Sequence, residues 1–307
     1  MKRGFFAAVS AILCFVVVLS TFGCVALDEK IRDESESDSD YTGTSLTTDD
    51  KIVTTETKKK TEKKTEKKTQ KQTEATNPLE LRFASYNIYH GGNNSDLKKI
   101  AANIKDNGIE IVGLQEVDNN TKRSGKINQV KRLSELTGYQ YYHFFKAINH
   151  DGGEYGLAIL SKYPIEQSKK ISLSSGTAEQ RILGYSKINV NGTMINFFVT
   201  HLSYDGEGGG SSRSKQFSEV ATELAKYDNF VLSGDFNTRN LDEYNVINGS
   251  ALVNSKEDPR VTYPDGKSPL DNLVYSTSTW AFGEINVVTE SYSDHYMIHA
   301  VGTFTEK

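Results

Sequence analysis

Beyond residue 78, short polar motifs stand at the ends of hydrophobic runs. They place carboxylates, amides and imidazoles where buried strands would end, and open α/β sheets gather side chains from distant parts of the chain at such ends. Carboxylate and amide oxygens suit hard divalent cations, and imidazoles transfer protons near neutral pH. This combination is typical of phosphoester hydrolysis. The set comprises Asn87, Glu116, His201, Asp235, Asn237, Asp271, Asp294 and His295.

The local patterns indicate how two of these motifs are presented. In Gly-Asp-Phe-Asn, Asp235 and Asn237 are two residues apart and would share one face of a continuing strand, with Phe236 pointing into the core. Glu116 ends an apolar run, where a charged side chain is costly unless it is solvated or paired with a cation. The alternative for Glu116 is an exposed loop carboxylate.

The order of the motifs resembles that of the endonuclease/exonuclease/phosphatase superfamily of metal-dependent phosphoesterases, which includes DNase I-like nucleases. Across residues 79–305 the order is Asn, Gln-Glu, Thr-His, Gly-Asp-Phe-Asn, Asp and Ser-Asp-His. The resemblance implies a four-layered α/β/β/α sandwich, in which helices flank two packed sheets. The alternation of strand and helix patterns by itself predicts only an α/β or α+β fold.

The resemblance also implies a Mg²⁺ or Mn²⁺ cofactor and assigns roles around it. Glu116 and Asp294 would bind the metal ion, and Asn87 would help to hold the same site. His295 would activate water or contact the scissile phosphate, and Asp271 would orient its imidazole. A purely structural hydrogen bond is the alternative for His295.

A second group of residues would act on the phosphate. By resemblance, Asp235 positions or deprotonates a water or assists a second metal, and Asn237 donates to a phosphoryl oxygen. His201 is a second phosphate contact or a general acid, and Glu154 lies where the nuclease branch carries a carboxylate partner for this imidazole. A surface position fits Glu154 equally well. Arg123 and Arg181 are further candidates for substrate binding, because guanidinium groups bind phosphate. The alternative for both arginines is a surface salt bridge.

Charge and cysteine content limit the chemistry. Residues 1–76 hold 13 basic and 13 acidic residues, so the formal charge of −4 belongs to the remainder of the chain. The remainder is therefore not broadly basic, which removes the simplest argument for tight nucleic-acid binding without excluding a nuclease. The two cysteines are Cys14 and Cys24, so a metal site beyond residue 78 must use oxygen and nitrogen ligands.

The N-terminal part predicts export. Residues 1–24 combine Lys2 and Arg3 with an apolar run, and Cys24 follows small residues as in a bacterial lipoprotein signal. An uncleaved membrane anchor is the alternative. Residues 25–78, with their Lys/Thr/Glu-rich tract, predict a disordered polar linker, and residues 79–307 form the predicted catalytic domain. We expect the domain at the extracytoplasmic face of the membrane, lipid-anchored or released.

These features predict an exported monomeric phosphoesterase that cleaves phosphodiesters by in-line attack of water, most simply a nuclease. Two other enzymes fit the same residues: a phospholipid or sphingomyelin phosphodiesterase, and an inositol-phosphate phosphatase. The partners would accordingly be a nucleic acid, phospholipid or inositol phosphate, with the membrane reached through the lipid anchor. A non-catalytic surface-binding module would be expected to have lost Glu116, Asp235 or His295, and all three are present.

The anchor can be tested by replacing its lipidation site. If Cys24 is lipidated, Cys24→Ser should move the protein from the membrane fraction to the soluble fraction, measured by fractionation and immunoblotting. A Cys14→Ser variant is the matched control and should stay with membranes. Membrane retention of the Cys24→Ser variant would instead identify the apolar segment itself as the anchor.

Overall fold

The computed structural model describes residues 78–305, except for 93, 205–209 and 291. The export segment, Cys24 and the predicted linker up to residue 77 lie outside the described residues. Export, lipidation and the linker therefore stay predictions. No helix among the described residues is long and apolar enough to cross a membrane.

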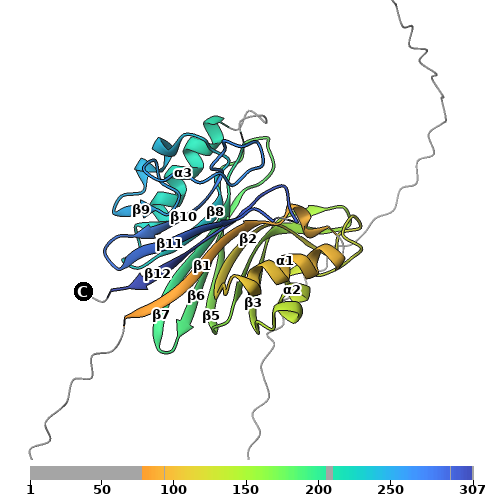
Figure 1. The fold of residues 1–307 in the computed structure, drawn as a ribbon. Coiled ribbons are helices and arrows are strands. Elements are labelled where there is room, and N and C mark those ends of the chain that lie inside the picture. Colours follow the sequence, from red (N-terminus) through yellow and green to blue (C-terminus); the bar gives the residue numbers. More distant parts are fainter. Residues whose placement is uncertain (1–77, 93, 205–209, 291, 306–307) are drawn as a thin grey trace, which may run out of the picture. The chain divides into compact units, whose positions relative to one another are not determined.

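The described residues form two six-stranded mixed sheets (Figure 1). The first has the order β11-β12-β1-β2-β4-β3, and the second β5-β6-β7-β8-β10-β9. The strands of the first sheet are β1 (Leu79–Asn87), β2 (Ile111–Asn119), β3 (Tyr141–His150), β4 (Gly153–Ser161), β11 (Trp280–Val288) and β12 (Met297–Phe304). Those of the second are β5 (Ile165–Ser172), β6 (Ile182–Val190), β7 (Thr193–His201), β8 (Val231–Asp235), β9 (Ser250–Leu252) and β10 (Asp271–Ser276).

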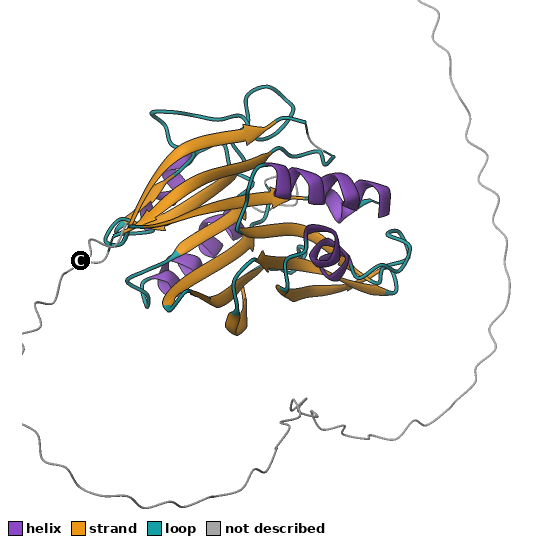
Figure 2. Ribbon diagram, turned by 60° about the horizontal axis from the view of Figure 1, so that its bottom comes forward, coloured by secondary structure: helices purple, strands orange, loops and turns teal. Residues whose placement is uncertain are grey.

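Helices cover the outer face of each sheet (Figure 2). Apolar side chains of α1 and α2 pack on the first sheet, and those of α3 and η3 pack on the second. This arrangement confirms the predicted α/β/β/α sandwich. The helices are α1 (Asn94–Asp106), α2 (Gln129–Thr137) and α3 (Gly210–Leu224), with the 3₁₀ helices η1 (Tyr89–Gly91) and η3 (Leu241–Val246).

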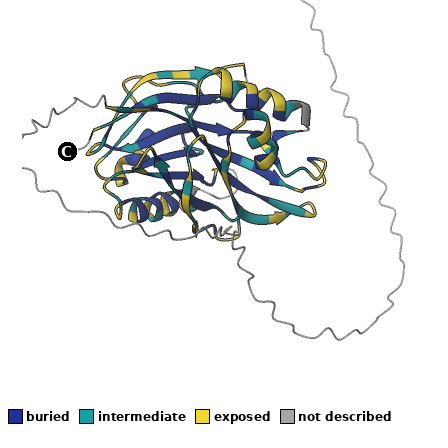
Figure 3. Cartoon of the chain, turned by 90° about the horizontal axis from the view of Figure 1, so that it is seen from below, coloured by how far each residue is buried: buried dark blue, intermediate teal, exposed yellow. Residues whose placement is uncertain are grey.

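The central core lies between the sheets, where the strands are buried (Figure 3). Phe83 of β1 stacks on Phe197 of β7 with ring centroids 5.8 Å apart, and Trp280 meets Phe83 edge-on at 5.3 Å. Strand alternation sends every second side chain into this layer and the others toward the helices. The two sheets are therefore fixed to each other by interdigitated apolar side chains.

Local sequence signals match the elements that they predict. Asn191 and Gly192 both have positive φ, 53° and 99°, as the two-residue turn between β6 and β7 requires. Gly108, with φ 66°, follows the end of α1 as the expected helix stop. Phe236 is fully buried and stacks on Phe217 of α3, which confirms its predicted core position.

Two parallel strand pairs determine where polar side chains can meet. β1 lies parallel to β2 in the first sheet, and β7 lies parallel to β8 in the second. The last residues of β7 and β8, His201 and Asp235, therefore lie side by side, and Asn87, the last residue of β1, lies beside Gln115 of β2, which continues to Asn119. Since the sheets pack face to face, these four positions meet at one edge of the sandwich.

Close approach of the two sheets explains a glycine on β2. A Cβ on Gly113 would lie 1.8 Å from Ser233 Oγ of β8, so no larger side chain fits without displacement. Gly113→Ala should destabilise the fold by about 1–3 kcal/mol in denaturant unfolding, because overpacking forces side chains or backbone to move.

A matched control lies on β11. A Cβ added to Gly283 would have no other atom within 4 Å, so Gly283→Ala should change the free energy of unfolding by less than about 0.5 kcal/mol. Equal effects of the two substitutions would contradict the close packing of the sheets at Gly113.

Candidate active site

The eight polar residues marked by the sequence motifs gather at this edge of the sandwich. Asn87, His201 and Asp235 end β1, β7 and β8, and Asp271 begins β10, opposite Asp235 in the antiparallel register. Glu116 lies within β2, while Asn237 follows β8 and Asp294 and His295 precede β12. Residues that are more than 200 positions apart in the sequence are thus brought together.

An irregularity in β2 directs Glu116 to the site. The pairing of β2 with β4 shifts register between Leu114 and Val117, and Glu116 has a positive φ of 57°. Its neighbour Gln115 is buried and donates to Ser85 Oγ at 3.3 Å, so the Gln of the Gln-Glu motif has a structural position. A bulge of this kind re-aims one side chain without ending the strand.

Asn87 connects the two sheets. Its Nδ2 donates to Glu116 Oε1 at 3.1 Å and to Asp235 Oδ2 at 3.0 Å, and its Oδ1 accepts the backbone N–H of Tyr89. Its amide nitrogen, rather than the oxygen that a metal would bind, therefore faces the carboxylates. In this arrangement Asn87 orients Glu116 and Asp235.

Asp271, His295 and Asp235 form a continuous series of contacts. His295 Nδ1 lies 2.8 Å from Asp271 Oδ2, and His295 Nε2 lies 3.6 Å from Asp235 Oδ2. All three side chains are buried. The expected pairing of Asp271 with His295 is present, and both imidazole nitrogens face acceptors.

Burial and neighbouring charges set the protonation of this group. Burial opposes the charged imidazolium, but Asp271 and Asp235 outweigh it and raise the pKa of His295 to about 10. Burial raises the pKa of Asp235 to about 6, with His295 opposing the rise. Near neutral pH, His295 is therefore a cation and Asp235 is the more available base.

His201 has the opposite surroundings. Its Nδ1 lies 3.2 Å from Arg181 Nη1, and its Nε2 lies 3.0 Å from Asn237 Nδ2 and 3.5 Å from Asp235 Oδ2. Burial, together with the positive charges of Arg181 and His295, lowers the pKa of His201 well below its usual value. His201 is therefore a neutral imidazole.

The expected partnership between Glu154 and His201 is not found. Glu154 is instead bound by Lys146 Nζ at 3.0 Å and by Asn119 Nδ2 at 2.9 Å. Strand alternation explains the difference, since the next residue, Tyr155, is the one that faces the pocket. The group that meets the His201 Nδ1 is Arg181, which also lines the pocket.

Arg123, the other arginine expected to contact substrate, lines the pocket. The fully buried carboxylate of Asp118 accepts hydrogen bonds from both Nε and Nη2 of Arg123, each at 2.8 Å. The guanidinium lies over the Tyr155 ring, 5.5 Å from its centroid, and a third of the side chain remains exposed. The bidentate contact fixes the orientation of the guanidinium at the pocket wall.

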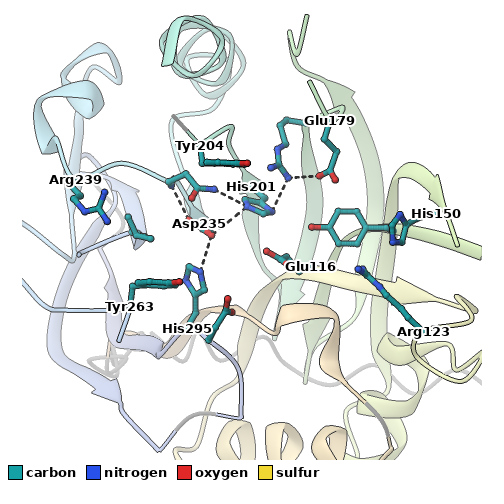
Figure 4. Close-up of a pocket in the computed structure, with 15 residues that line it drawn as sticks. Glu116, Arg123, His150, Glu179, His201, Tyr204, Asp235, Arg239, Tyr263 and His295 are labelled. Carbon is teal, nitrogen blue, oxygen red and sulfur yellow. Dashed lines mark hydrogen bonds and ion pairs between the residues drawn. The ribbon is translucent and has the colours of Figure 1, made fainter. Parts of the chain in front are cut away.

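A pocket of 680 Å³ contains this constellation (Figure 4). Several lining residues were not singled out from the sequence, and some of them flank a motif that was. Arg239 follows Gly-Asp-Phe-Asn, Tyr204 follows Thr-His, and Tyr155 follows Glu154. The further lining residues that sequence reasoning missed are His150, Glu179, Tyr263 and Leu270.

The donor set fits a divalent cation. Burial raises the pKa of Glu116 to about 7, and the charges of Asp235 and Asp294 add to the rise. Burial likewise raises the pKa of Asp294. Carboxylates that disfavour one another's ionisation are stabilised by a bound cation, and oxygen ligands suit Mg²⁺ or Mn²⁺.

A second ligand set overlaps the first. One atom each from Asp235, Asp271 and His295 lies within 4.8 Å of the others, so this buried group could also hold a metal ion. A protonated His295, with both nitrogens facing carboxylates, has no lone pair for a metal. The hydrogen bonds therefore favour Glu116 and Asp294 as ligands.

Comparison with known proteins defines the class. Residues 84–295 match the model of the Endonuclease/Exonuclease/phosphatase family. The chain belongs to this family, whose members are divalent-metal-dependent hydrolases of phosphoester bonds. A comparison with curated proteins found no match.

Solved structures share the fold. An endonuclease/exonuclease/phosphatase from Beutenbergia cavernae is 20% identical, with a TM-score of 0.60 over 73% of this chain and 72% of its own. The human Nocturnin catalytic domain is 20% identical, with a TM-score of 0.60 over 74% and 94%. The mannosyl-6-phosphatase Bt3783 from Bacteroides thetaiotaomicron is 18% identical, with a TM-score of 0.57 over 73% and 100%.

The Asp271–His295 contact predicts coupled catalytic losses. His295→Ala should lower kcat about 10²–10⁴-fold, because it removes a group that contacts the reacting phosphate or water. Asp271→Asn should lower kcat less, since the imidazole remains but loses its orienting charge. The double variant should be far less than additive in steady-state kinetics, because the two residues act as one unit.

Additive losses in this cycle would contradict the assignment of the pair, and unchanged turnover of His295→Ala would remove His295 from the mechanism. His299→Ala is a suitable control histidine, because His299 lies in β12 outside the pocket.

Proposed function

We propose that this protein is an exported, Mg²⁺- or Mn²⁺-dependent phosphodiesterase in which water attacks phosphorus in line with the leaving oxygen. The observation that carries the proposal is the Asp271–His295–Asp235 series, which adjoins Glu116 and Asp294 in one pocket. This pocket combines the buried imidazolium of His295, the carboxylate of Asp235 as a base, and two carboxylates that could bind a metal ion.

The protonation states suggest which catalytic role each residue has. His295, as a cation held by Asp271, would donate to a phosphoryl oxygen and neutralise developing charge. Asp235, with its pKa of about 6, would orient the attacking water and accept its proton. Asn237 would donate to a phosphoryl oxygen. This assignment gives the role of base to Asp235 and leaves His295 as the phosphate contact.

Glu116 and Asp294 would hold the metal ion, with Asn87 orienting Glu116. When bound, the cation would supply positive charge to polarise the phosphoryl group. Both carboxylates would then be ionised, since a nearby cation lowers a carboxyl pKa.

Two arginines favour a substrate that extends on both sides of the scissile phosphate. Arg239 and Arg123 lie on opposite sides of the histidine–carboxylate cluster in Figure 4, and both line the pocket. A small phosphomonoester would occupy only the centre between them. A diester with further anionic or polar groups could reach both arginines, as a nucleic-acid strand would.

Phospholipid, sphingomyelin or inositol-phosphate hydrolysis is the alternative within the same chemistry. Membrane attachment through Cys24 would favour a lipid substrate. We propose the nucleic-acid diester first, because the pocket offers guanidinium groups at both ends.

A substrate panel tests the proposal. The purified protein should hydrolyse a diester among plasmid DNA, RNA, sphingomyelin, bis-p-nitrophenyl phosphate and inositol phosphates, with product or chromophore release as the readout. Asp235→Asn is the matched inactive control, because it removes the proposed base with little change in shape. Hydrolysis of monoesters alone would contradict the diester assignment, and activity equal in Asp235→Asn would indicate a contaminant.

Metal removal gives an independent prediction. Exhaustive treatment with EDTA should abolish hydrolysis, and Mg²⁺ or Mn²⁺ should restore it. Glu116→Gln should raise the metal concentration required for half-maximal activity, so excess metal should partly rescue this variant. Glu154→Gln is the matched control, because Glu154 pairs with Lys146 outside the pocket and should leave the metal requirement unchanged. Full activity of the chelated protein would refute the metal site.

A further inference from the structure

The surroundings of His201 differ from those of a catalytic imidazole supported by a carboxylate. The group that meets its Nδ1 is a guanidinium nitrogen, Arg181 Nη1, at 3.2 Å. Arg181 is itself held by Glu179, whose Oε1 accepts Nη1–H at 2.6 Å. Both Arg181 and His201 are buried, so water does not screen this contact.

Donor and acceptor chemistry, together with the charges of the neighbours, then favours one tautomer. A guanidinium has only donors and keeps its protons, so the nitrogen that faces it must be an acceptor. Nδ1 of His201 is therefore unprotonated, and a neutral imidazole carries its hydrogen on Nε2. The low pKa of His201, caused by burial and by Arg181 and His295, agrees with this state.

The Nε2 atom of His201 lies on the side of the ring that faces the catalytic carboxylate. Asp235 Oδ2 lies 3.5 Å from Nε2, and both residues line the pocket. Asn237 Nδ2 donates one hydrogen to the backbone oxygen of Leu202 at 3.0 Å and lies 3.0 Å from Nε2. Nε2 therefore faces a neutral donor and a carboxylate, whereas Nδ1 faces a cationic donor, and this difference in charge favours the hydrogen on Nε2. The Nε2–H can therefore be shared with an oxygen of Asp235 or of a bound phosphoryl group.

We propose that Arg181 is a positioning residue that locks His201 in the Nε2–H tautomer, so that His201 serves as a neutral hydrogen-bond donor to a phosphoryl oxygen. This inference rests on the proposed phosphoester hydrolysis for its functional part. It keeps the expected phosphate contact of His201 in place of the general-acid alternative, and it gives Arg181 a positioning role.

The same geometry opposes a general-acid role for His201. To act as a general acid, the imidazole would first need hydrogens on both nitrogens, so that loss of one proton leaves it neutral. A hydrogen on Nδ1 would point at the N–H of Arg181. A neutral imidazole that gave up its single hydrogen would become an anion, so His201 can share the Nε2 hydrogen but does not transfer it to the leaving oxygen.

Nitrogen NMR tests the tautomer without any substrate. In the full chain labelled with ¹⁵N-histidine near neutral pH, the two-bond correlation pattern of His201 should be that of the Nε2–H tautomer. Its signal is identified by its loss in His201→Gln. A pattern of the Nδ1–H tautomer, or of an imidazolium, in the unmodified protein would overturn the proposal.

Substitutions of Arg181 test whether this residue sets the tautomer of His201 or only supports the fold. Arg181→Met removes the fixed donor, so His201 should now populate the Nδ1–H tautomer. Arg181→Lys, which retains a cationic donor, should keep more of the original pattern. Arg123→Met is the matched control, because Arg123 lines the same pocket but its side-chain hydrogen bonds go to Asp118. An unchanged tautomer in a folded Arg181→Met variant would overturn the positioning role.

Kinetics then tests the donor role on whichever phosphoester the protein hydrolyses. His201→Ala should lower kcat about 10²–10³-fold, as loss of one transition-state donor typically does. His201→Gln, which can donate from its amide, should retain at least about tenfold more activity than His201→Ala. Equal losses would overturn the donor role. Absence of phosphoester hydrolysis in the unmodified protein would contradict the proposed function, while the NMR result would still decide the tautomer.

Discussion

The amide of Asn87 is the contact on which the site depends. It donates to Glu116 in its own sheet and to Asp235 in the other, so one side chain sets the distance between carboxylates from two sheets. These contacts are possible because β1 ends at Asn87 beside the Gln-Glu motif of β2, because β8 ends at Asp235, and because the apolar layer between the sheets holds these positions together. The core thus positions the chemistry without contributing a reacting group.

The two histidines beside Asp235, His201 and His295, differ in charge state for the same physical reason. The nitrogens of His295 face two carboxylates, which favour the imidazolium. The Nδ1 of His201 faces a guanidinium, which excludes a proton there. Asp235 lies within 3.6 Å of both imidazoles and receives hydrogen bonds from Asn87 and from the backbone of Asn237. A single carboxylate is therefore flanked by a cationic and a neutral donor, an arrangement suited to an oriented water and a phosphoryl group.

Family membership explains the architecture, and individual residues distinguish this chain. The solved relatives share the fold at about one fifth sequence identity, so likeness in fold does not specify a substrate. The pocket walls carry what is particular to this protein: Arg123 held by Asp118, Arg181 in contact with His201, and Arg239 across the cluster from Arg123. Specificity is expected to follow these groups more than the central carboxylates, because they meet the parts of a substrate that differ between phosphoesters.

The sequence by itself determined the order of strands and helices and the motif residues that form one pocket and its immediate support, while the sandwich fold followed from the resemblance carried by the order of those motifs. It could do so because hydrophobic periodicity and turn residues are local properties, and because most of the motifs sit at the end of a strand. It could not decide on which face a side chain emerges from a strand: Glu154 was expected at the site, but alternation brings Tyr155 there and leaves Glu154 with Lys146. Nor could it decide charge states, since the pKa of His201 and that of His295 depend on burial and on partners supplied by other strands and loops. Only the tertiary structure placed Arg181 against one imidazole and Asp271 against the other, because both contacts join residues that are distant in the sequence.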